Sequence, residues 1–212
     1  MSQFQLQLFK YSKQTLTLAE TEIQAQEYKQ DLLGIYNLNI QFIYLVNATI
    51  VNQEAFQNNL RLKMACMPNV KQLKSAAFYG CSSLKVVNAP QLKDIEGHVF
   101  FKCSSLISIN STLNSLGVCA FGGCCSLQQL NTSQISSLEW GSFLSCVSLR
   151  SFESDLITEV PVNCFFNCQS MTEFIADNVT TILGDGLKNC TSLHTLILPR
   201  LQTCDSSLDF PT

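Results

Sequence analysis

Charged side chains are scarce in this sequence: Asp, Glu, Lys and Arg make up 14% of the residues, where soluble domains usually have about 25%. The formal net charge is only −3. A chain with so little charge gives no electrostatic reason to expect binding to nucleic acid or to an anionic membrane. Ser, Thr, Asn and Gln must therefore cover much of the surface, and we expect no nucleic-acid partner.

Long apolar runs are also missing. The longest stretches, such as FIYLV at residues 42–46, are far shorter than the ~20 residues that a transmembrane helix needs. The first residues, MSQFQLQLFKYSKQ, lack the basic end and apolar run of a secretory signal. We therefore expect no membrane insertion and a cytoplasmic location, with the cell surface as the alternative if the natural chain begins earlier.

The usual catalytic motifs are absent as well. The sequence contains no G-x-G-x-x-G, no G-x-x-x-x-G-K-[ST] and no H-E-x-x-H. Its only histidines are His98 and His194, so few bases are at hand for the activation of a cysteine nucleophile. We expect no enzymatic activity and no cofactor.

What the sequence does contain is an internal repeat with a period of about 22 residues. Its first position is held, at a step that varies by no more than one residue, by Phe56, Phe78, Phe100, Phe121, Phe143, Phe165 and Leu187. Position seven is Leu62, Leu84, Leu106, Leu127, Leu149, Met171 and Leu193, and position ten is Ala65, Val87, Ile109, Leu130, Phe152, Phe174 and Leu196. Each unit reads F-x-x-C-x-x-L-x-x-[VIL] and continues with L-x-x-I.

Position four of the repeat holds Asn59, Cys81, Cys103, Cys124, Cys146, Cys168 and Cys190. This position follows the phenylalanine at a bend, where a small side chain that bonds the backbone is needed. A free cysteine behaves as a small buried hydrophobe with a weak S–H donor. We interpret these residues as a structural ladder.

Three other roles for the cysteines remain as alternatives. Cysteines on neighbouring rungs, ~4.8 Å apart, are close enough for disulfides, although an intracellular location would keep them reduced. Zinc could be bound by Cys164 with Cys168, or by Cys119 with Cys124 and Cys125, but no second Cys/His pair has matching spacing. A catalytic thiol is the third alternative and lacks an evident base.

The length of the repeat restricts the fold. A period of about 22 residues is too short for paired-helix repeats or propeller blades, and it fits a leucine-rich repeat of about 20–29 residues. L-x-x-[VIL] predicts a short strand on one wall, and L-x-x-I predicts the opposite wall. We therefore expect an α/β-type repeat solenoid, mostly strand and loop, with short parallel strands stacked at ~4.8 Å.

The N-terminal segment, residues 1–33, does not follow the repeat. FQLQL (4–8) and TLTLA (15–19) alternate with period two and predict a hairpin, and ETEIQAQEYKQDLL (20–33) predicts a weak helix. Because the terminal units of a solenoid must cover an exposed core, we interpret residues 1–33 as an N-terminal cap.

The solenoid itself is expected to run over residues 34–212. Stepping back one period from Phe56 finds apolar residues mostly where the repeat requires them, so residues 34–55 are interpreted as a degenerate repeat. Phe210 would open a further repeat that the chain end leaves incomplete.

The repeat resembles the BspA-like, or Treponema pallidum type, leucine-rich repeat. The matching stretches are AAFYGCSSLKVVNAPQLKDIEG (76–97), VFFKCSSLISINSTLNSLG (99–117) and GLKNCTSLHTLILPRLQTC (186–204), and the resemblance covers about residues 50–210. It implies a solenoid similar to those of bacterial surface adhesins and of families in anaerobic protists. The role it implies is the binding of proteins or matrix, without catalysis.

Binding by a solenoid takes place on the exposed residues of its stacked strands. Positions eight, nine and eleven should face outward, and position eleven carries a row of asparagines. The candidate partner-binding residues are Lys85, Asn88, Asn110, Gln129, Asn131, Arg150, Glu153 and Glu173. The asparagine row is either a solubilising ladder of stacked amides or part of a binding surface, and we favour the second as a hypothesis.

The predicted function is therefore that of a non-catalytic module which binds a protein or peptide partner. The alternative is a structural solenoid whose exposed ends associate end to end, since an exposed edge invites pairing, or an adhesin-like surface protein if the chain is exported. Trp140, the single tryptophan, is expected to be a packed edge residue, with an exposed interaction anchor as the alternative.

Overall fold

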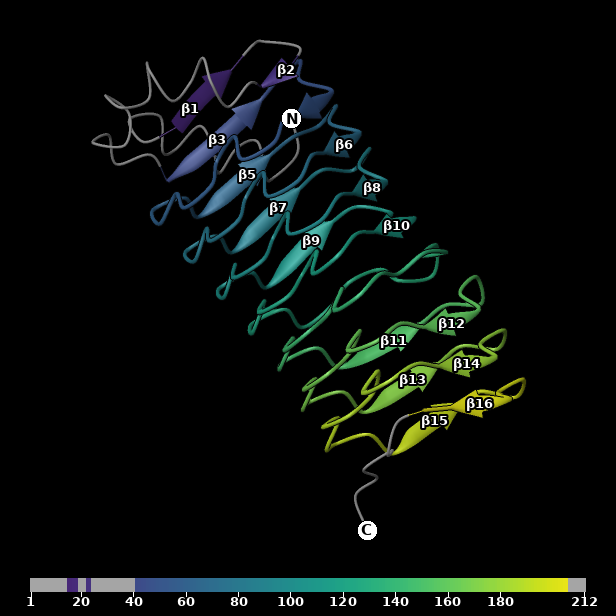
Figure 1. The fold of residues 1–212 in the computed structure, drawn as a ribbon. Coiled ribbons are helices and arrows are strands. Elements are labelled where there is room, and N and C mark those ends of the chain that lie inside the picture. The colour runs from purple at the N-terminus through teal and green to yellow at the C-terminus, as the bar shows by residue number, and fades with distance from the viewer. Residues whose placement is uncertain (1–14, 19–21, 24–40, 206–212) are drawn as a thin grey trace.

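The computed structural model of the chain describes residues 41–205 and, before them, the strands Thr15–Leu18 and Glu22–Ile23. These parts form a parallel β-solenoid of about seven turns with about 22 residues per turn (Figure 1). No helix occurs in the described part of the chain, and so none that could cross a membrane. The solenoid is confirmed, whereas the α/β-type label is wrong.

The absence of helix has a local cause in the backbone. The phenylalanines at position one of the repeat are called anchor phenylalanines below. The residues two before and two after each of them tend to adopt positive φ, as Ala76 (57°) and Gly80 (69°) do around Phe78. A right-handed helix requires consecutive residues with φ near −60°. Two left-handed residues in this segment divide it into turns, so the chain reverses direction without forming a helix.

The first wall is a ladder of strands of three or four residues, as L-x-x-[VIL] predicted. Its members are β1 (Thr15–Leu18), β3 (Phe42–Leu45), β5 (Met64–Cys66), β7 (Val86–Asn88), β9 (Ser108–Asn110), β11 (Ser151–Glu153), β13 (Glu173–Ile175) and β15 (Thr195–Ile197). All pairs are parallel, and Met64 lies opposite Val86, which lies opposite Ser108. Position ten points inward and positions nine and eleven point outward, because side chains alternate along a strand.

The second wall is formed by strands of two residues at L-x-x-I, which confirms the opposite wall. These strands are β2 (Glu22–Ile23), β4 (Ile50–Val51), β6 (Gln72–Leu73), β8 (Asp94–Ile95), β10 (Ser115–Leu116), β12 (Glu159–Val160), β14 (Thr181–Ile182) and β16 (Thr203–Cys204). The two ladders of arrows run side by side along the solenoid in Figure 1.

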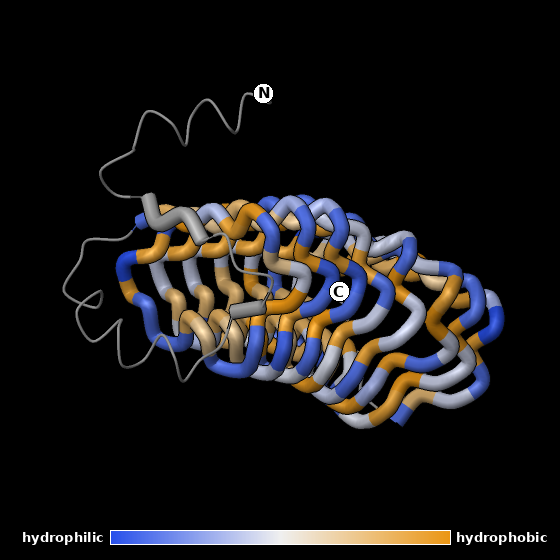
Figure 2. Tube along the Cα trace, turned by 90° about the horizontal axis from the view of Figure 1, so that it is seen from above, coloured by the Kyte–Doolittle hydropathy of each residue, from blue (hydrophilic) through white to orange (hydrophobic). Residues whose placement is uncertain are grey.

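Between the walls lies one continuous apolar core. The anchor phenylalanines stack along it: the ring centroids of Phe78 and Phe100 are 5.6 Å apart, and those of Phe100 and Phe121 are 5.5 Å apart. Stacked aromatic pairs contribute about 0.5–1.5 kcal/mol beyond the area that they bury. Figure 2 shows the same order in the hydropathy, which recurs at equivalent places in successive turns.

Both ladders are interrupted in the coil that starts at Phe121. Between β9 and β11 only the bridge Ser108–Gln129 remains, and between β10 and β12 only Ser115–Ser137. The preceding coil is one residue shorter than the others, because its turn from Ile109 to Leu113 is one residue shorter than the turn from Val87 to Leu92. The remaining bridges still join equivalent positions, since Ser108 and Gln129 both hold position nine, so the register is kept while pairing shrinks to one residue on each wall.

The hydrogen bonds at the interruption also differ from those of a regular junction. In a regular junction the amide N of Ala89 donates to the carbonyl O of Asn110 at 3.0 Å. The equivalent bond from Ser111 is missing, and the buried Ser111 Oγ has no hydrogen-bond partner. At the next junction the side chain of Thr132 replaces the ladder: its Oγ1 donates to Glu153 O at 2.7 Å and accepts from Glu153 N at 3.0 Å.

The N-terminal predictions fall only partly on described residues. β1 pairs in parallel with β3, and β2 with β4, so both extend the two walls. Glu22–Ile23 is a strand rather than part of a helix. The other members of the predicted hairpin and helix, and the incomplete repeat at Phe210, lie outside the described residues. In the degenerate repeat, Ile43 and Val51 are fully buried.

Candidate functional site

The predicted ladder cysteines join successive coils. Each thiol donates to the carbonyl O of the anchor phenylalanine one coil earlier, at Sγ–O distances of 3.0 Å for Cys81–Phe56, 3.1 Å for Cys103–Phe78, Cys124–Phe100 and Cys146–Phe121, 3.2 Å for Cys168–Phe143 and 3.3 Å for Cys190–Phe165. Asn59 differs, because its Oδ1 accepts from Leu62 N at 3.2 Å within its own coil.

These thiols are protonated at neutral pH. Burial raises the pKa of Cys81 and of Cys190 to about 12, and it raises the pKa of Cys103 and Cys124 well above 9.0. Since the thiolate is the nucleophile and the metal ligand, the ladder is unsuited to either chemistry. All eleven cysteines have free thiols, so no disulfide joins neighbouring coils.

The candidate zinc ligands are not assembled into a site. No group of three or more His, Cys, Asp or Glu that could hold a metal occurs among the residues that the structure describes. Cys119 and Cys164 are buried in the core, whereas Cys125 is exposed. The histidines are far from one another in the fold: His98 packs edge-on against Phe101, and the His194 Nδ1 lies 3.1 Å from Thr195 Oγ1.

The predicted partner-binding residues lie on the outside of the first wall and its flanking residues. Seven of the eight are exposed, and Asn88 is half-buried. The position-eleven row has one buried member that the sequence did not indicate, Cys66, which packs against Phe42 in a small cluster separate from the main core. Trp140 is 43% exposed, so the expectation of a packed edge residue was wrong.

The structure brings three of these residues together. Asn110, Gln129 and Asn131 surround a shallow hollow of about 500 Å³, which Ser108, Ile109, Leu130 and Ser151 also line. The hollow lies at the interruption of the first ladder. Leu130 is half-buried there, although position ten is buried in the coils on both sides. Lys85, Asn88, Arg150, Glu153 and Glu173 lie outside the hollow.

The asparagine row is continuous only up to the hollow. Asn110 Nδ2 donates to Asn88 Oδ1 at 2.7 Å, and Asn88 Nδ2 donates to Cys66 Sγ at 3.7 Å. Asn131 turns away: its Oδ1 accepts from Ser133 N at 3.3 Å and from Ser133 Oγ at 2.9 Å. The stacked-amide interpretation therefore describes Asn88 and Asn110 but not Asn131.

Charge is distributed unevenly along the solenoid. Residues 41–118 hold seven Lys and Arg against three Asp and Glu, a net of +4, whereas residues 119–205 hold three against eight, a net of −5. The change of sign coincides with the interruption. The net charge of the whole chain hides this asymmetry, which the order of the charged residues in the sequence shows.

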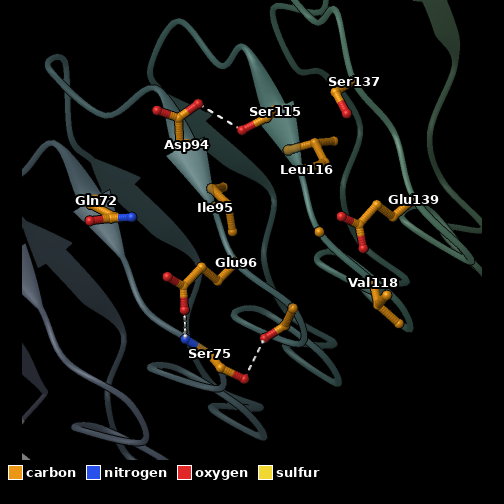
Figure 3. A pocket seen from close by; sticks show the side chains of 12 residues that line it. Gln72, Ser75, Asp94, Ile95, Glu96, Ser115, Leu116, Val118, Ser137 and Glu139 are labelled. Carbon is orange, nitrogen blue, oxygen red and sulfur yellow. Dashed lines mark hydrogen bonds between the residues drawn. The ribbon is translucent and has the colours of Figure 1, made fainter.

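A second hollow, of about 470 Å³, lies on the second wall around β8 and β10 and was not foreseen (Figure 3). Its carboxylates are mostly engaged by neighbouring coils. Asp94 Oδ1 accepts from Ser115 Oγ at 2.6 Å, and Glu96 pairs with Lys74 Nζ at 2.8 Å and accepts from Ser75 N at 2.9 Å. These bonds tie coils together, and we assign them a structural role.

Comparison with known proteins gives a family and a fold. The profile of the BspA type leucine-rich repeat region matches in six copies over residues 33–107, 49–172 and 105–207. A comparison with curated proteins finds no match.

Three solved structures have similar folds. The leucine-rich repeat protein TpLRR of T. pallidum is 22% identical, with a TM-score of 0.61 over 73% of this chain and 78% of that chain. A Bacteroides ovatus leucine-rich repeat protein is 22% identical, with a TM-score of 0.52 over 80% of this chain and 56% of that one. A leucine-rich cell surface protein of Faecalibacterium prausnitzii is 19% identical, with a TM-score of 0.50 over 77% of this chain and 40% of that one.

These likenesses agree with the two-walled solenoid and with the repeat that the anchors define. Because the family profile matches from residue 33 to residue 207, the chain belongs to the BspA-type leucine-rich repeat family.

Proposed function

We propose that this protein is a non-catalytic interaction module that binds a protein or peptide on its first wall, centred on the hollow of Asn110, Gln129 and Asn131. The observation that carries the proposal is the interruption of the first ladder at this point of the face. It exposes part of an apolar floor, at Leu130, within a rim of amides and hydroxyls. Binding sites commonly combine an apolar surface with a few polar groups that fix orientation.

The chemistry of the rim suits a peptide backbone. An amide side chain both donates and accepts hydrogen bonds, so Gln129 and Asn110 can pair with N–H and C=O groups of an extended segment. Arg150 and Glu153, exposed beside the hollow, would orient charged side chains of the partner. The raised thiol pKa values and the lack of an assembled metal-ligand group among residues 41–205 support a role in binding rather than catalysis.

Substitution of the hollow tests the proposal. Asn110→Arg with Asn131→Arg fills it with long charged side chains, while Ser104→Arg, an exposed residue on a turn of the same coil, is the matched control. Partners captured by the wild-type chain are purified and titrated against all three proteins. The double variant should bind at least about tenfold more weakly, as loss of a central contact does, and equal affinities for all three proteins would refute the assignment.

An adhesin-like surface protein is the second candidate. It is favoured by the description of the F. prausnitzii relative as a cell surface protein, although this chain spans 40% of that one. Surface labelling of intact source cells would test it: a labelled chain supports export, and a chain labelled only after lysis supports a cytoplasmic module.

A further inference from the structure

We propose that the partner of the first wall is a second copy of this chain, bound antiparallel about a twofold axis at the hollow. The proposal rests on the proposed function, because it uses the same face. It follows from where the exposed charges stand on that face, on the turn that follows each of its strands and, for Lys71 and Lys93, directly before the second-wall strands β6 and β8.

One end of the face is basic. Lys63 and Lys71 come from the coil that starts at Phe56, and Lys85 and Lys93 come from the next coil; all four are exposed. The two coils are direct neighbours, since the amide N of Lys85 donates to Lys63 O at 2.8 Å. Equivalent lysines therefore stand on adjacent rungs.

The other end is acidic. Glu153 and Asp155 come from the coil that starts at Phe143, and Glu173 and Asp177 come from the next coil; all four are exposed. Ser151 lies opposite Glu173 in the parallel register, so these coils are also neighbours. The two coils between the ends carry the hollow, and their outward positions eight, nine and eleven carry no charge.

The eight charges have no ion-pair partner within residues 41–205. The ion pairs there are Lys74–Glu96 and Lys188–Asp185, neither of which involves them. Like charges on adjacent strands, at a spacing of ~4.8 Å, repel one another and destabilise a sheet. A surface with the opposite charges in the opposite order would relieve both ends at once.

A second copy turned end for end provides that surface. In the antiparallel arrangement the coil of Lys63 lies over the coil of Glu173, and the coil of Lys85 lies over the coil of Glu153. The coil of Asn110 then lies over that of Gln129, so the two hollows meet at the centre. Every contact occurs twice about the axis, whereas a parallel arrangement would place like charges together.

On the first wall itself, Arg150 opposes this pattern. Arg150 is an exposed cation within the acidic end, and it would face the partner's coil that carries Lys85. Its replacement by glutamine should therefore tighten the association by about two- to tenfold, the range expected when one like-charge contact is removed.

Exchange of charges between the ends provides the test. The basic-end variant carries Lys85→Glu and Lys93→Glu, and the acidic-end variant carries Glu153→Lys and Asp155→Lys. Each variant alone should associate at least about tenfold more weakly than wild type, because like charges then meet. A mixture of the two should form heterodimers, since both ends are complementary again. Lys102→Glu, an exposed site on the loop before Cys103, is the control.

Sedimentation velocity of the full chain over about 1–100 µM, at low and at high salt, measures these equilibria. We expect a wild-type dimer that weakens with salt. A wild-type chain that is monomeric throughout, variants that dimerise as tightly as wild type, or a mixture that stays monomeric would each overturn the pairing. Species that keep growing with concentration would also overturn it, because head-to-tail contacts do not close.

The same proteins separate this proposal from the proposed function. If wild type is monomeric but Asn110→Arg with Asn131→Arg still abolishes binding of a different protein, self-pairing is refuted and the binding face stands. If wild type is monomeric and that variant binds its partners normally, both proposals fail.

Discussion

Raising the pH above 9 should unfold this protein, because its core contains six buried ladder thiols that must stay protonated. Burial raises the folded-state pKa of Cys81 and Cys190 to about 12, from an ordinary value near 9.0. The pKa values of the other four ladder thiols are also raised well above 9.0. The stabilisation is therefore complete only well below pH 9, and it is lost as the pH rises through 9 toward the folded-state pKa.

The loss of stability at high pH depends mainly on how far the thiols ionise in the unfolded state. At pH 10 an unfolded thiol of pKa near 9.0 gains somewhat more than about 1 kcal/mol by ionising, while a folded thiol whose pKa is raised well above 9.0 by burial gains much less. Six such thiols lower the free energy of unfolding by about 8 kcal/mol, which is comparable to the total stability of a typical domain. At pH 9 the same sum is only about 2 kcal/mol.

Urea unfolding at pH 7, 9 and 10 under reducing conditions measures this loss. In the double variant Cys81→Ser, Cys190→Ser two ionisable groups are removed, so the loss between pH 7 and pH 10 should shrink by about 3 kcal/mol. Val87→Ala, which weakens the same core without removing a thiol, should show the wild-type loss. Equal pH dependence in the serine variant and wild type would refute the reasoning.

Three further predictions concern stability in urea at pH 7. Gly117→Ala should cost about 1–3 kcal/mol, because its Cβ would lie 2.7 Å from a backbone N of the preceding coil. The control Gly184→Ala, whose Cβ would have its nearest contact at 3.5 Å, should be nearly neutral. Equal losses of stability in the two variants would contradict the close approach at Gly117. Ser111→Ala should be neutral or stabilising, since the buried Oγ of Ser111 has no hydrogen-bond partner. Ser154→Ala should cost about 1–2 kcal/mol, because the Oγ of Ser154 donates to a carbonyl at 2.6 Å. A larger loss of stability in Ser111→Ala than in Ser154→Ala would contradict these assignments. Phe121→Ala should cost about 3–5 kcal/mol through a gap in the stacked phenylalanines, and a loss below about 1 kcal/mol would contradict a tightly packed stack.

The two walls were predictable because every coil repeats the same spacing. An inward residue such as Val87 or Ile109 recurs at one period, and so do the ladder cysteines, so a chance pattern in a single coil is averaged out. The solenoid needs only this spacing to stack its coils at a fixed strand distance.

The α/β label was wrong because the residues with positive φ that prevent a helix share no residue type by which the sequence would reveal them. Glu54, Ala76 and His98 occupy equivalent positions with φ of 59°, 57° and 61°, and none is a glycine. A sequence pattern gives the apolar spacing but not these backbone angles, so the turns around each phenylalanine could not be recognised as a barrier to helix.

The hollow needed the structure for a different reason. The missing residue before Leu113 is visible in the sequence as a shortened step from Phe100 to Phe121, but the loss of strand pairing in the following coil is visible only in the structure. Asn110 and Asn131 were predicted to face outward, and they do. The sequence does not show that Asn110 continues the amide row whereas Asn131 bonds Ser133.

Site-specific photo-crosslinking in the source cell tests the central claim, that the first wall is the recognition surface, most directly. A photoreactive residue is placed at Gln129 in the hollow or at Ser104 on a turn, both exposed. If the first wall is the recognition surface, position 129 gives a discrete crosslinked product, whether with another protein or with a second copy, and position 104 gives none. Discrete products from position 104 alone would contradict it.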